Sequence, residues 1–137
     1  MPHADYSHRS TVDKLGIKPG QRVALVDHAF PLDEMLCREV RARAGEADGS
    51  DGPVDVVLIS VDAATDAAAM LRIWRERIDP AGGIWLLTPK RGQAGYVNQT
   101  ELIGAGLAAE LVDIKICSVS ETVSGMRFVI RRRDRTL

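Results

Sequence analysis

Mostly apolar runs along the chain predict strands that are buried on both faces. The run Ile84 to Leu87 lies inside the segment Gly82 to Lys90, which opens on a glycine pair, and two further runs occupy Val23 to Val26 and Val54 to Val61. A strand without a polar face has no side to turn toward water. These three segments are therefore expected in a parallel sheet that helices cover on both sides, with Gly82 to Lys90 as its central strand.

The segments between these runs have the spacing of amphipathic helices, with apolar residues three or four positions apart. The inward positions are Leu32, Met35, Leu36, Val40 and Ala44 in the first helix, Met70, Leu71, Trp74 and Ile78 in the second, which runs from about Thr65 to Ile78, and Leu102, Ile103 and Leu107 in the third. Asn98 or Thr100 is positioned to cap the third helix. Gly104 and Gly106 weaken an isolated helix, so they indicate that this helix packs closely on the sheet.

The C-terminal part predicts two further strands, Leu111 to Ser118 and Met126 to Arg132. Because residues 119–125 are too few for a helical crossover, these strands should be antiparallel neighbours. The whole order predicts an α/β fold, a Rossmann-like three-layer sandwich of about five strands, mostly parallel and closed by a C-terminal antiparallel hairpin. We expect a flexible N-terminus at 1–9, a single domain at 10–133 and a C-terminal tail at 134–137.

Charge and length narrow the classes of function. The 137 residues suffice for one domain, and a net charge of −1 argues against a general nucleic-acid or membrane-surface role. Arginines nevertheless crowd the C-terminus, at Arg127, Arg131, Arg132, Arg133 and Arg135. They are typical of a solvated terminal strand, and contact with an anion is the alternative. The glycine-rich segment Gly45 to Pro53 is expected to be a flexible surface loop.

The N-terminal residues and the cysteines bear on location and metal binding. No apolar run has the length of a membrane span, and the first residues lack the apolar core of a signal peptide, so we expect a cytoplasmic protein. Cys37 and Cys117 are expected to be buried free thiols. Three scattered histidines, His3, His8 and His28, provide no metal-ligand spacing, and no metal site is predicted.

Parts of the chain resemble class I methyltransferases. Leu15 to Asp27 is similar to the segment leading into the first motif of that family, Val54 to Ser60 to its fourth strand, and Ile78 to Gly83 to the turn before its fifth. Where those enzymes carry a glycine-rich loop, this chain has Asp27 to Pro31, without glycine. The second and third strands, which hold the ribose-binding acid, are expected to be missing. We therefore predict no cofactor, and in particular no binding of S-adenosylmethionine.

A second resemblance rests on more specific residues. The block Gly83 to Lys90, then Gly92, Gly95 to Val97 and Ser124 to Arg127, resembles the domain of unknown function family 3052, small proteins that are abundant in actinobacteria. The resemblance spans roughly residues 7 to 133. Members commonly have tryptophan before the Ser-Gly pair, where this chain has Val123. The resemblance implies a Rossmann-like fold and leaves the activity open.

The ends of the predicted strands supply the candidate site. Ligands of open α/β sheets bind beyond the carboxyl ends of the parallel strands, and the start of an antiparallel last strand returns to the same edge. The ligand-binding candidates are Thr88, Lys90, Tyr96, Ser124 and Arg127, and the catalytic candidates are Asp27 and His28. Lys90 suits a phosphate or carboxylate anchor, although an ion pair with Glu121 or Asp62 would also account for it.

Three hypotheses of function follow. The first is a non-catalytic Rossmann-like domain that binds a partner protein or a small anionic ligand at the edge marked by Lys90, Tyr96 and Ser124. The second is an enzyme of a biosynthetic or modification pathway that uses Asp27, His28 and Lys90 on a small substrate. The third is a degenerate methyltransferase-like subunit that supports an active partner. A homodimer through an exposed edge strand is possible with each of them.

Overall fold

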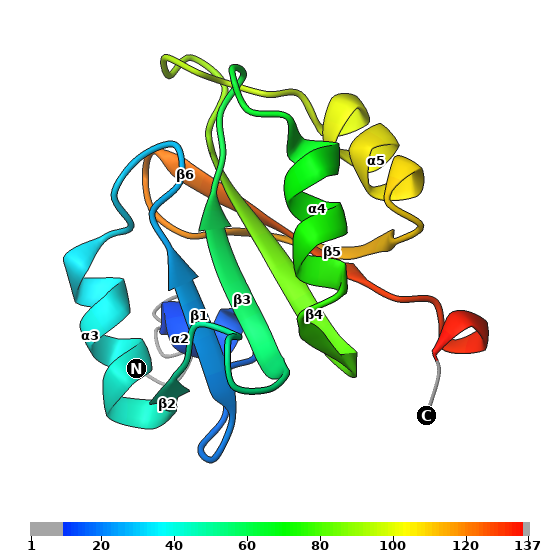
Figure 1. The fold of residues 1–137 in the computed structure, drawn as a ribbon. Helices are drawn as coiled ribbons and strands as arrows, with labels where there is room; N and C mark the ends of the chain where they lie inside the picture. Colours follow the sequence, from blue (N-terminus) through cyan, green and yellow to red (C-terminus); the bar gives the residue numbers. More distant parts are fainter. Residues whose placement is uncertain (1–9, 136–137) are drawn as a thin grey trace, which may run out of the picture.

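A six-stranded sheet in the order β2-β1-β3-β4-β6-β5 runs through the molecule (Figure 1). The computed structural model describes residues 10–135. The strands are β1 (Arg22–Val26), β2 (Gly45–Glu46), β3 (Val54–Ser60), β4 (Ile78–Pro89), β5 (Val112–Ser118) and β6 (Val123–Val129). The first four are parallel, and β6 is antiparallel to both β4 and β5. This confirms the predicted fold class, with one strand more than expected.

Helices cover the two faces of the sheet and complete three layers. The helices are α2 (Thr11–Lys14), α3 (Glu34–Arg43), α4 (Ala67–Arg75) and α5 (Gln99–Ala108), followed by a 3-10 turn at Arg132–Asp134. One apolar cluster joins α2 and α3 to the sheet through Val40 and Trp85, and the other joins α4 and α5 through Leu71 and Leu102. Within residues 10–135, no helix combines the length and the apolarity that crossing a bilayer requires.

The predicted termini fall largely outside the described residues. The expected flexible segment 1–9 lies outside them altogether, as do positions 136–137 of the expected tail. Asp134 ends the 3-10 turn, and the Arg135 Nε donates to the carbonyl of Ile130 at 3.0 Å.

The central strand β4 is buried on both faces, as its apolar run predicts. Ile84 and Leu86 belong to the cluster beneath α4 and α5, whereas Trp85 and Leu87 belong to the cluster beneath α2 and α3. The exposure of these four side chains does not exceed 1%. The Trp85 Nε1 donates a hydrogen bond to the carbonyl of Leu15 at 3.0 Å, so its polar atom is satisfied inside the core.

Polar side chains set the first residue of each long helix. The side-chain oxygens of Asp33, Asp66 and Asn98 accept the backbone N–H three residues further on, at 2.9 to 3.0 Å. Each contact satisfies one of the free donors at a helix N-terminus. Of the two caps considered for α5, Asn98 is the one used, so this helix begins directly after the loop that leaves β4.

Two strand predictions need correction. Gly45–Glu46 was expected in a loop but forms β2, parallel to β1, because the N–H groups of Gly45 and Ala47 donate to Gln21 and Val23 carbonyls at 2.9 Å. A short second strand is therefore present after all. The predicted helix end at Ile78 is also wrong, since β4 starts there and continues through a register shift against β3. Main-chain bonds and bulges of this kind leave no hydrophobic signal.

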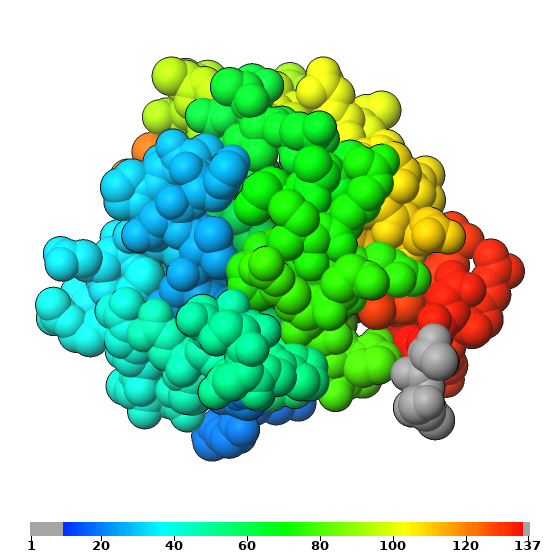
Figure 2. Space-filling view, viewed as in Figure 1, coloured from blue at the N-terminus to red at the C-terminus, as the bar shows by residue number. Residues whose placement is uncertain are grey.

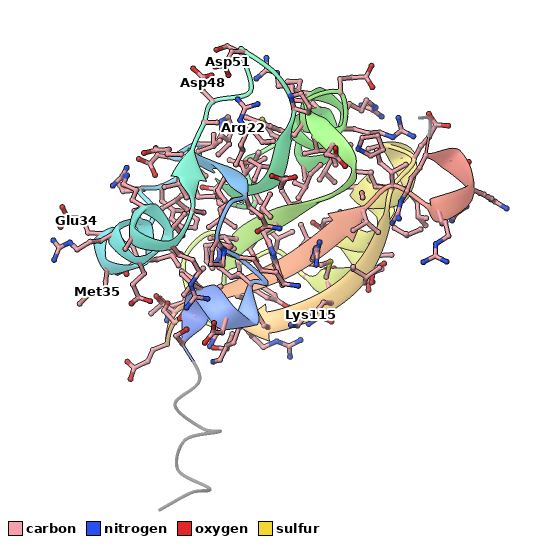
Figure 3. All side chains as sticks on the ribbon, turned by 90° about the horizontal axis from the view of Figure 1, so that it is seen from below. Arg22, Glu34, Met35, Asp48, Asp51 and Lys115 are labelled. Carbon is pink, nitrogen blue, oxygen red and sulfur yellow. The ribbon has the colours of Figure 1, made fainter. Side chains whose placement is uncertain are left out.

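Two residues predicted to face inward are on the surface. Met35 is 61% exposed on the outer side of α3 (Figure 3), and Leu107 is 53% exposed near the end of α5. The buried stripe of α3 is Leu36, Cys37 and Val40, so Met35 lies one helical step away from it. On α5 the buried residues include Leu102 and Gly106, which again places Leu107 one position beyond the packed face.

The glycines of α5 differ in what surrounds them. A Cβ at Gly106 would lie 2.5 Å from Phe128 Cε2, whereas a Cβ at Gly104 would meet nothing within 4 Å. The expectation of close packing is therefore right for Gly106 and wrong for Gly104. Gly106 lets α5 approach β6, and this approach forms one side of the site described below.

The turn after β1 is closed by one buried hydroxyl. The Ser60 Oγ, at the end of β3, accepts the N–H groups of His28, Ala29 and Phe30 at 3.0, 3.2 and 3.1 Å and donates to the carbonyl of Phe30. Ser60 is fully buried. The turn therefore directs three backbone donors into the protein. On the same side of the sheet, residues 45–53 lie against α4 (Figure 2), with Gly49 beside Trp74.

The two glycines of α5 make a matched test of the packing. Gly106→Ala should lower the free energy of unfolding by about 1–3 kcal/mol, because the added methyl overlaps Phe128. Gly104→Ala should raise it by about 1 kcal/mol, because alanine stabilises a helix relative to glycine where space is open. Urea unfolding of both variants checks this, and equal effects would contradict the described contact.

Removing the Ser60 hydroxyl tests the closure of the turn. Ser60→Ala should lower the free energy of unfolding by about 1–3 kcal/mol, since buried N–H groups lose their acceptor. Ser124→Ala on β6 is the control, with an expected change within about 0.5 kcal/mol, because no described residue bonds to that hydroxyl. Denaturant unfolding with amide exchange of residues 28–30 measures the effect, and an unchanged Ser60→Ala protein would refute it.

Candidate functional site

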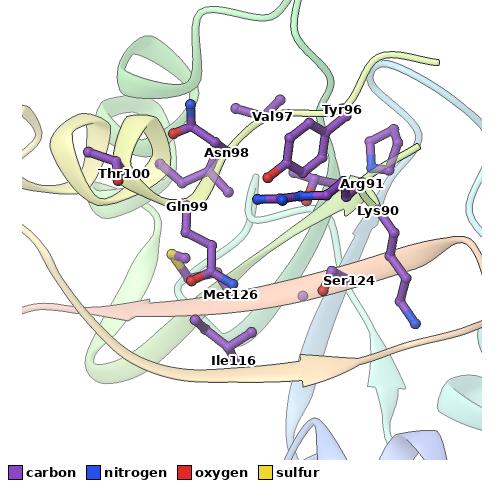
Figure 4. A pocket seen from close by; sticks show the side chains of 14 residues that line it. Lys90, Arg91, Tyr96, Val97, Asn98, Gln99, Thr100, Ile116, Ser124 and Met126 are labelled. Carbon is purple, nitrogen blue, oxygen red and sulfur yellow. The ribbon is translucent and has the colours of Figure 1, made fainter. Parts of the chain in front are cut away.

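A cavity of about 420 Å³ opens at the carboxyl end of β4, between the start of α5 and the hairpin of β5 and β6 (Figure 4). It is lined by 88–91 from the end of β4 and the following loop, 96–100 leading into α5, Leu102 of α5, 124–126 of β6, and Ile116 of β5. Segments far apart in the sequence thus meet at one end of the sheet. Cavities of this size are typical of small-molecule sites.

The sheet register brings a row of hydroxyl groups together beside the cavity. Thr88 lies opposite Ser124, and Ser124 lies opposite Ser118. Side chains two positions apart on a strand share a face, so Thr88 faces the same side as Leu86, toward α4 and α5. Thr88 is only 4% exposed, and no residue in the described part of the chain hydrogen-bonds to the Thr88 or Ser124 hydroxyl.

Lys90 is held at the rim of the cavity by neutral oxygens. Its Nζ donates to the Ser118 Oγ at 2.6 Å, and its backbone N–H donates to the carbonyl of Thr122 at 2.8 Å. The ion pairs considered with Glu121 or Asp62 are not formed among the described residues. The ammonium charge of Lys90 therefore has no carboxylate to neutralise it.

A loop with two tight turns places Arg91 against Tyr96. Gly92 and Gly95 have φ values of +90° and +83°, in the left-handed region that glycine adopts most easily. The Arg91 Cζ lies 5.8 Å from the centre of the Tyr96 ring, within the range of a cation–π contact. Both side chains line the cavity, and Figure 4 shows the guanidinium lying along the ring.

The first turn of α5 adds backbone donors. The Asn98 side chain accepts the N–H of Glu101, but the N–H groups of Gln99 and Thr100 have no acceptor within residues 10–135. Both residues line the cavity. A helix N-terminus carries a partial positive charge and favours anions. Together with Lys90 and Arg91, it makes the lining positive, because no aspartate or glutamate contributes to the lining.

The two catalytic candidates lie elsewhere. Asp27 and His28 are exposed at the end of β1, which is separated from β4 by β3. The Asp27 Oδ1 accepts the N–H of Leu32 at 2.8 Å, and the backbone of His28 is bound to Ser60. Neither residue lines the cavity. The structure therefore does not bring Asp27 and His28 together with Lys90.

Arg127 lies on the opposite face of β6. It pairs with Trp85, whose side chain faces α2 and α3, and the guanidinium packs on Gly83, where a Cβ would overlap its Nε. This Nε is buried without a hydrogen-bond partner in the described chain. Burial, and to a lesser extent Arg135, lowers the pKa of Arg127, which nevertheless stays protonated. Of the five ligand-binding candidates, four line the cavity and Arg127 does not.

Sequence reasoning missed Arg91, the first turn of α5, Met126 and Ile116 as parts of the site. The signal for α5 was available, because Asn98 was recognised as a cap directly after the loop that carries Tyr96. The remaining positions depend on the strand register, which the hydrophobic pattern does not specify at an exposed strand such as β5. The binding role of all these residues stays a prediction.

The thiols and acids of the described chain provide no further reactive centre. Burial raises the pKa of both Cys37 and Cys117, so their thiols are held in the weakly nucleophilic protonated form. Among residues 10–135, no three histidine, cysteine, aspartate or glutamate side chains gather in a way that could hold a metal ion.

Similar solved structures are methyltransferases, at identities that establish the fold alone. The O-methyltransferase NcsB1 from neocarzinostatin biosynthesis, solved with S-adenosyl-L-homocysteine and 1,4-dihydroxy-2-naphthoic acid, has a TM-score of 0.61 at 15% identity, over 93% of this chain and 55% of that one. CalO1, the methyltransferase in calicheamicin biosynthesis in its SAH-bound form, has 0.58 at 15% identity, over 95% and 55%. The precorrin-6y C5,15-methyltransferase from Geobacter metallireducens GS-15 has 0.55 at 11% identity, over 88% and 85%.

These likenesses confirm a methyltransferase-like fold. The chain spans about half the length of NcsB1 and CalO1, at 55% of each. No curated protein matches the chain in sequence. Residues 12–132 match the family described as "Protein of unknown function (DUF3052)", in agreement with the resemblance of the Gly83 to Lys90 block. The chain therefore belongs to the DUF3052 family.

Proposed function

We propose that this domain binds a small anionic ligand in the cavity at the carboxyl end of β4, without catalysing a reaction on it. The observation that carries the proposal is the charge of the cavity. Lys90 and Arg91 line it, and no carboxylate does. An anion entering the cavity would be attracted by both side chains and would meet no like charge.

The hydrogen-bonding groups of the cavity support the same ligand class. The hydroxyls of Thr88 and Ser124 are free to donate, and so are the N–H groups of Gln99 and Thr100. Donors without partners at a helix N-terminus suit the oxygens of a carboxylate or phosphate. The lining also lacks the carboxylate, imidazole and thiol groups that most often serve as bases and nucleophiles, which favours binding over catalysis.

The turn after β1 is a poor fit for S-adenosylmethionine. A nucleotide-type cofactor needs backbone that it can approach closely beyond the first strand, and an acid after the second strand for the ribose. Here the N–H groups of residues 28–30 bond to the buried Ser60 hydroxyl, and Glu46 is held by Arg41 at 2.8 Å. No step of a methyl transfer is therefore derived for this chain.

A homodimer through β5 also stays a prediction. This strand is at the edge of the sheet and exposes Ile114 and Ile116. The register shift between Asp113 and Lys115 bends the strand, and such bulges, like an edge lysine, oppose pairing with a second chain. Lys115 in addition reaches across to the carbonyl of Lys14 at 2.9 Å.

Anion binding can be measured with inorganic phosphate at constant ionic strength. Phosphate should shift the amide NMR signals of 88–100 and 124–126, and Arg91→Gln should weaken binding about fivefold, as expected for an exposed charge contact of up to about 1 kcal/mol. Arg72→Gln, at an exposed position of α4, is the matched control and should bind like the wild type. Equal weakening by both variants, or shifts confined to other regions, would refute the proposal.

The cofactor prediction is tested separately with S-adenosylhomocysteine. Titration should leave the amide signals of residues 27–31 and Glu46 unchanged, and the midpoint of thermal unfolding should not rise, because a ligand stabilises only a fold that binds it. Saturable binding accompanied by shifts at the turn after β1 would show that the Ser60 closure opens for the cofactor, and the prediction would then be wrong.

A further inference from the structure

We infer that the ligand carries a flat aromatic ring next to its anionic group, so that its chemical class is an aromatic carboxylate. The inference rests on the proposed function of the cavity and adds the shape of the molecule. It is argued from the walls of the cavity, which differ in polarity from one end to the other.

The polar end can hold one oxyanion. Thr88 and Ser124 are directly opposite each other on β4 and β6 and face the same side of the sheet. Thr88 is 96% buried by its 4% exposure, yet no described residue bonds to its hydroxyl. Buried hydroxyls without a partner are uncommon in folded proteins. The oxygens of a carboxylate between the two hydroxyls would satisfy both.

The rest of the floor is apolar. Met126, Leu102 and Val97 line the cavity and are also members of the buried cluster beneath α5. Ile116 extends this surface at the open side, where it is 44% exposed. A bare inorganic anion would leave this surface in contact with water, whereas a ligand with an apolar part would cover it.

The opposite wall is flat. The Tyr96 ring, with the Arg91 guanidinium stacked along it, faces across the cavity toward Met126 and Ile116 in Figure 4. Two planar groups lying together prefer another planar group beside them, and a methionine sulfur makes favourable contacts with aromatic rings. A ring inserted between Tyr96 and Met126 would contact both walls.

The two ends together select the ligand class. A phosphate ion satisfies the polar end alone, and a neutral hydrocarbon satisfies the walls alone. The cavity of about 420 Å³ is larger than one oxyanion needs and lies within the range of small organic ligands. A fused-ring carboxylate uses both parts at once.

The inference is tested with three probes in calorimetric and NMR titrations, namely 2-naphthoate, its neutral isostere 2-naphthamide, and inorganic phosphate. We expect 2-naphthoate to bind at least tenfold more tightly than either of the others, with shifts at 88–100 and 124–126. If phosphate binds in an Arg91-dependent manner and 2-naphthoate binds no more tightly, the ring is refuted while the anion site stands. If neither probe shifts these residues, both proposals fail.

Variants of Tyr96 separate the ring from the charge. Tyr96→Leu should weaken 2-naphthoate binding about tenfold and leave phosphate binding unchanged, whereas Tyr96→Phe should bind both probes like the wild type. Ser124→Ala should weaken both probes, with Ser120→Ala, outside the lining, as its control. Should Tyr96→Leu fail to fold, the Ser124 pair and the probe series decide. Unchanged 2-naphthoate binding in folded Tyr96→Leu would overturn the inference.

Discussion

Burial of β4 on both faces is the constraint from which the rest of the arrangement follows. A strand whose side chains all avoid water needs an apolar layer above and below it, and the pairs α2 with α3 and α4 with α5 supply these layers. The first polar side chain of the run is Thr88, where the strand leaves the core. The cavity therefore begins at the point where burial of the central strand ends.

The parts of the fold that depend on hydrophobic burial were predictable from the sequence. The run Ile84 to Leu87 and the antiparallel final strands are examples, and so is the cap Asn98, because its amide oxygen has one local role. Features decided by main-chain contacts were not predictable. Gly45–Glu46 joins the sheet through backbone bonds alone, and Ile78 belongs to a strand because of a register shift that no periodicity announces.

The site was predictable to the extent that it depends on strand ends. Thr88 and Ser124 meet because an antiparallel strand starts where its parallel neighbour stops. Arg127 was misplaced because one position along a strand reverses the face, and its partner Trp85 points toward the other layer. Asp27 was grouped with the others although neighbouring strands are about 4.8 Å apart, so two strand positions separate it from β4 by roughly 10 Å.

The position of β6 between β4 and β5 has a consequence for how the protein is made. Among the described strands β6 comes last in the chain, yet β5 pairs with β6 alone. While the ribosome has not yet released β6, β5 has no neighbour and the outer side of β4 is bare. The serine, glycine and methionine of β6 complete the cavity wall, so the binding pocket is assembled only when synthesis reaches this strand, and a nascent chain exposes sticky sheet edges until then.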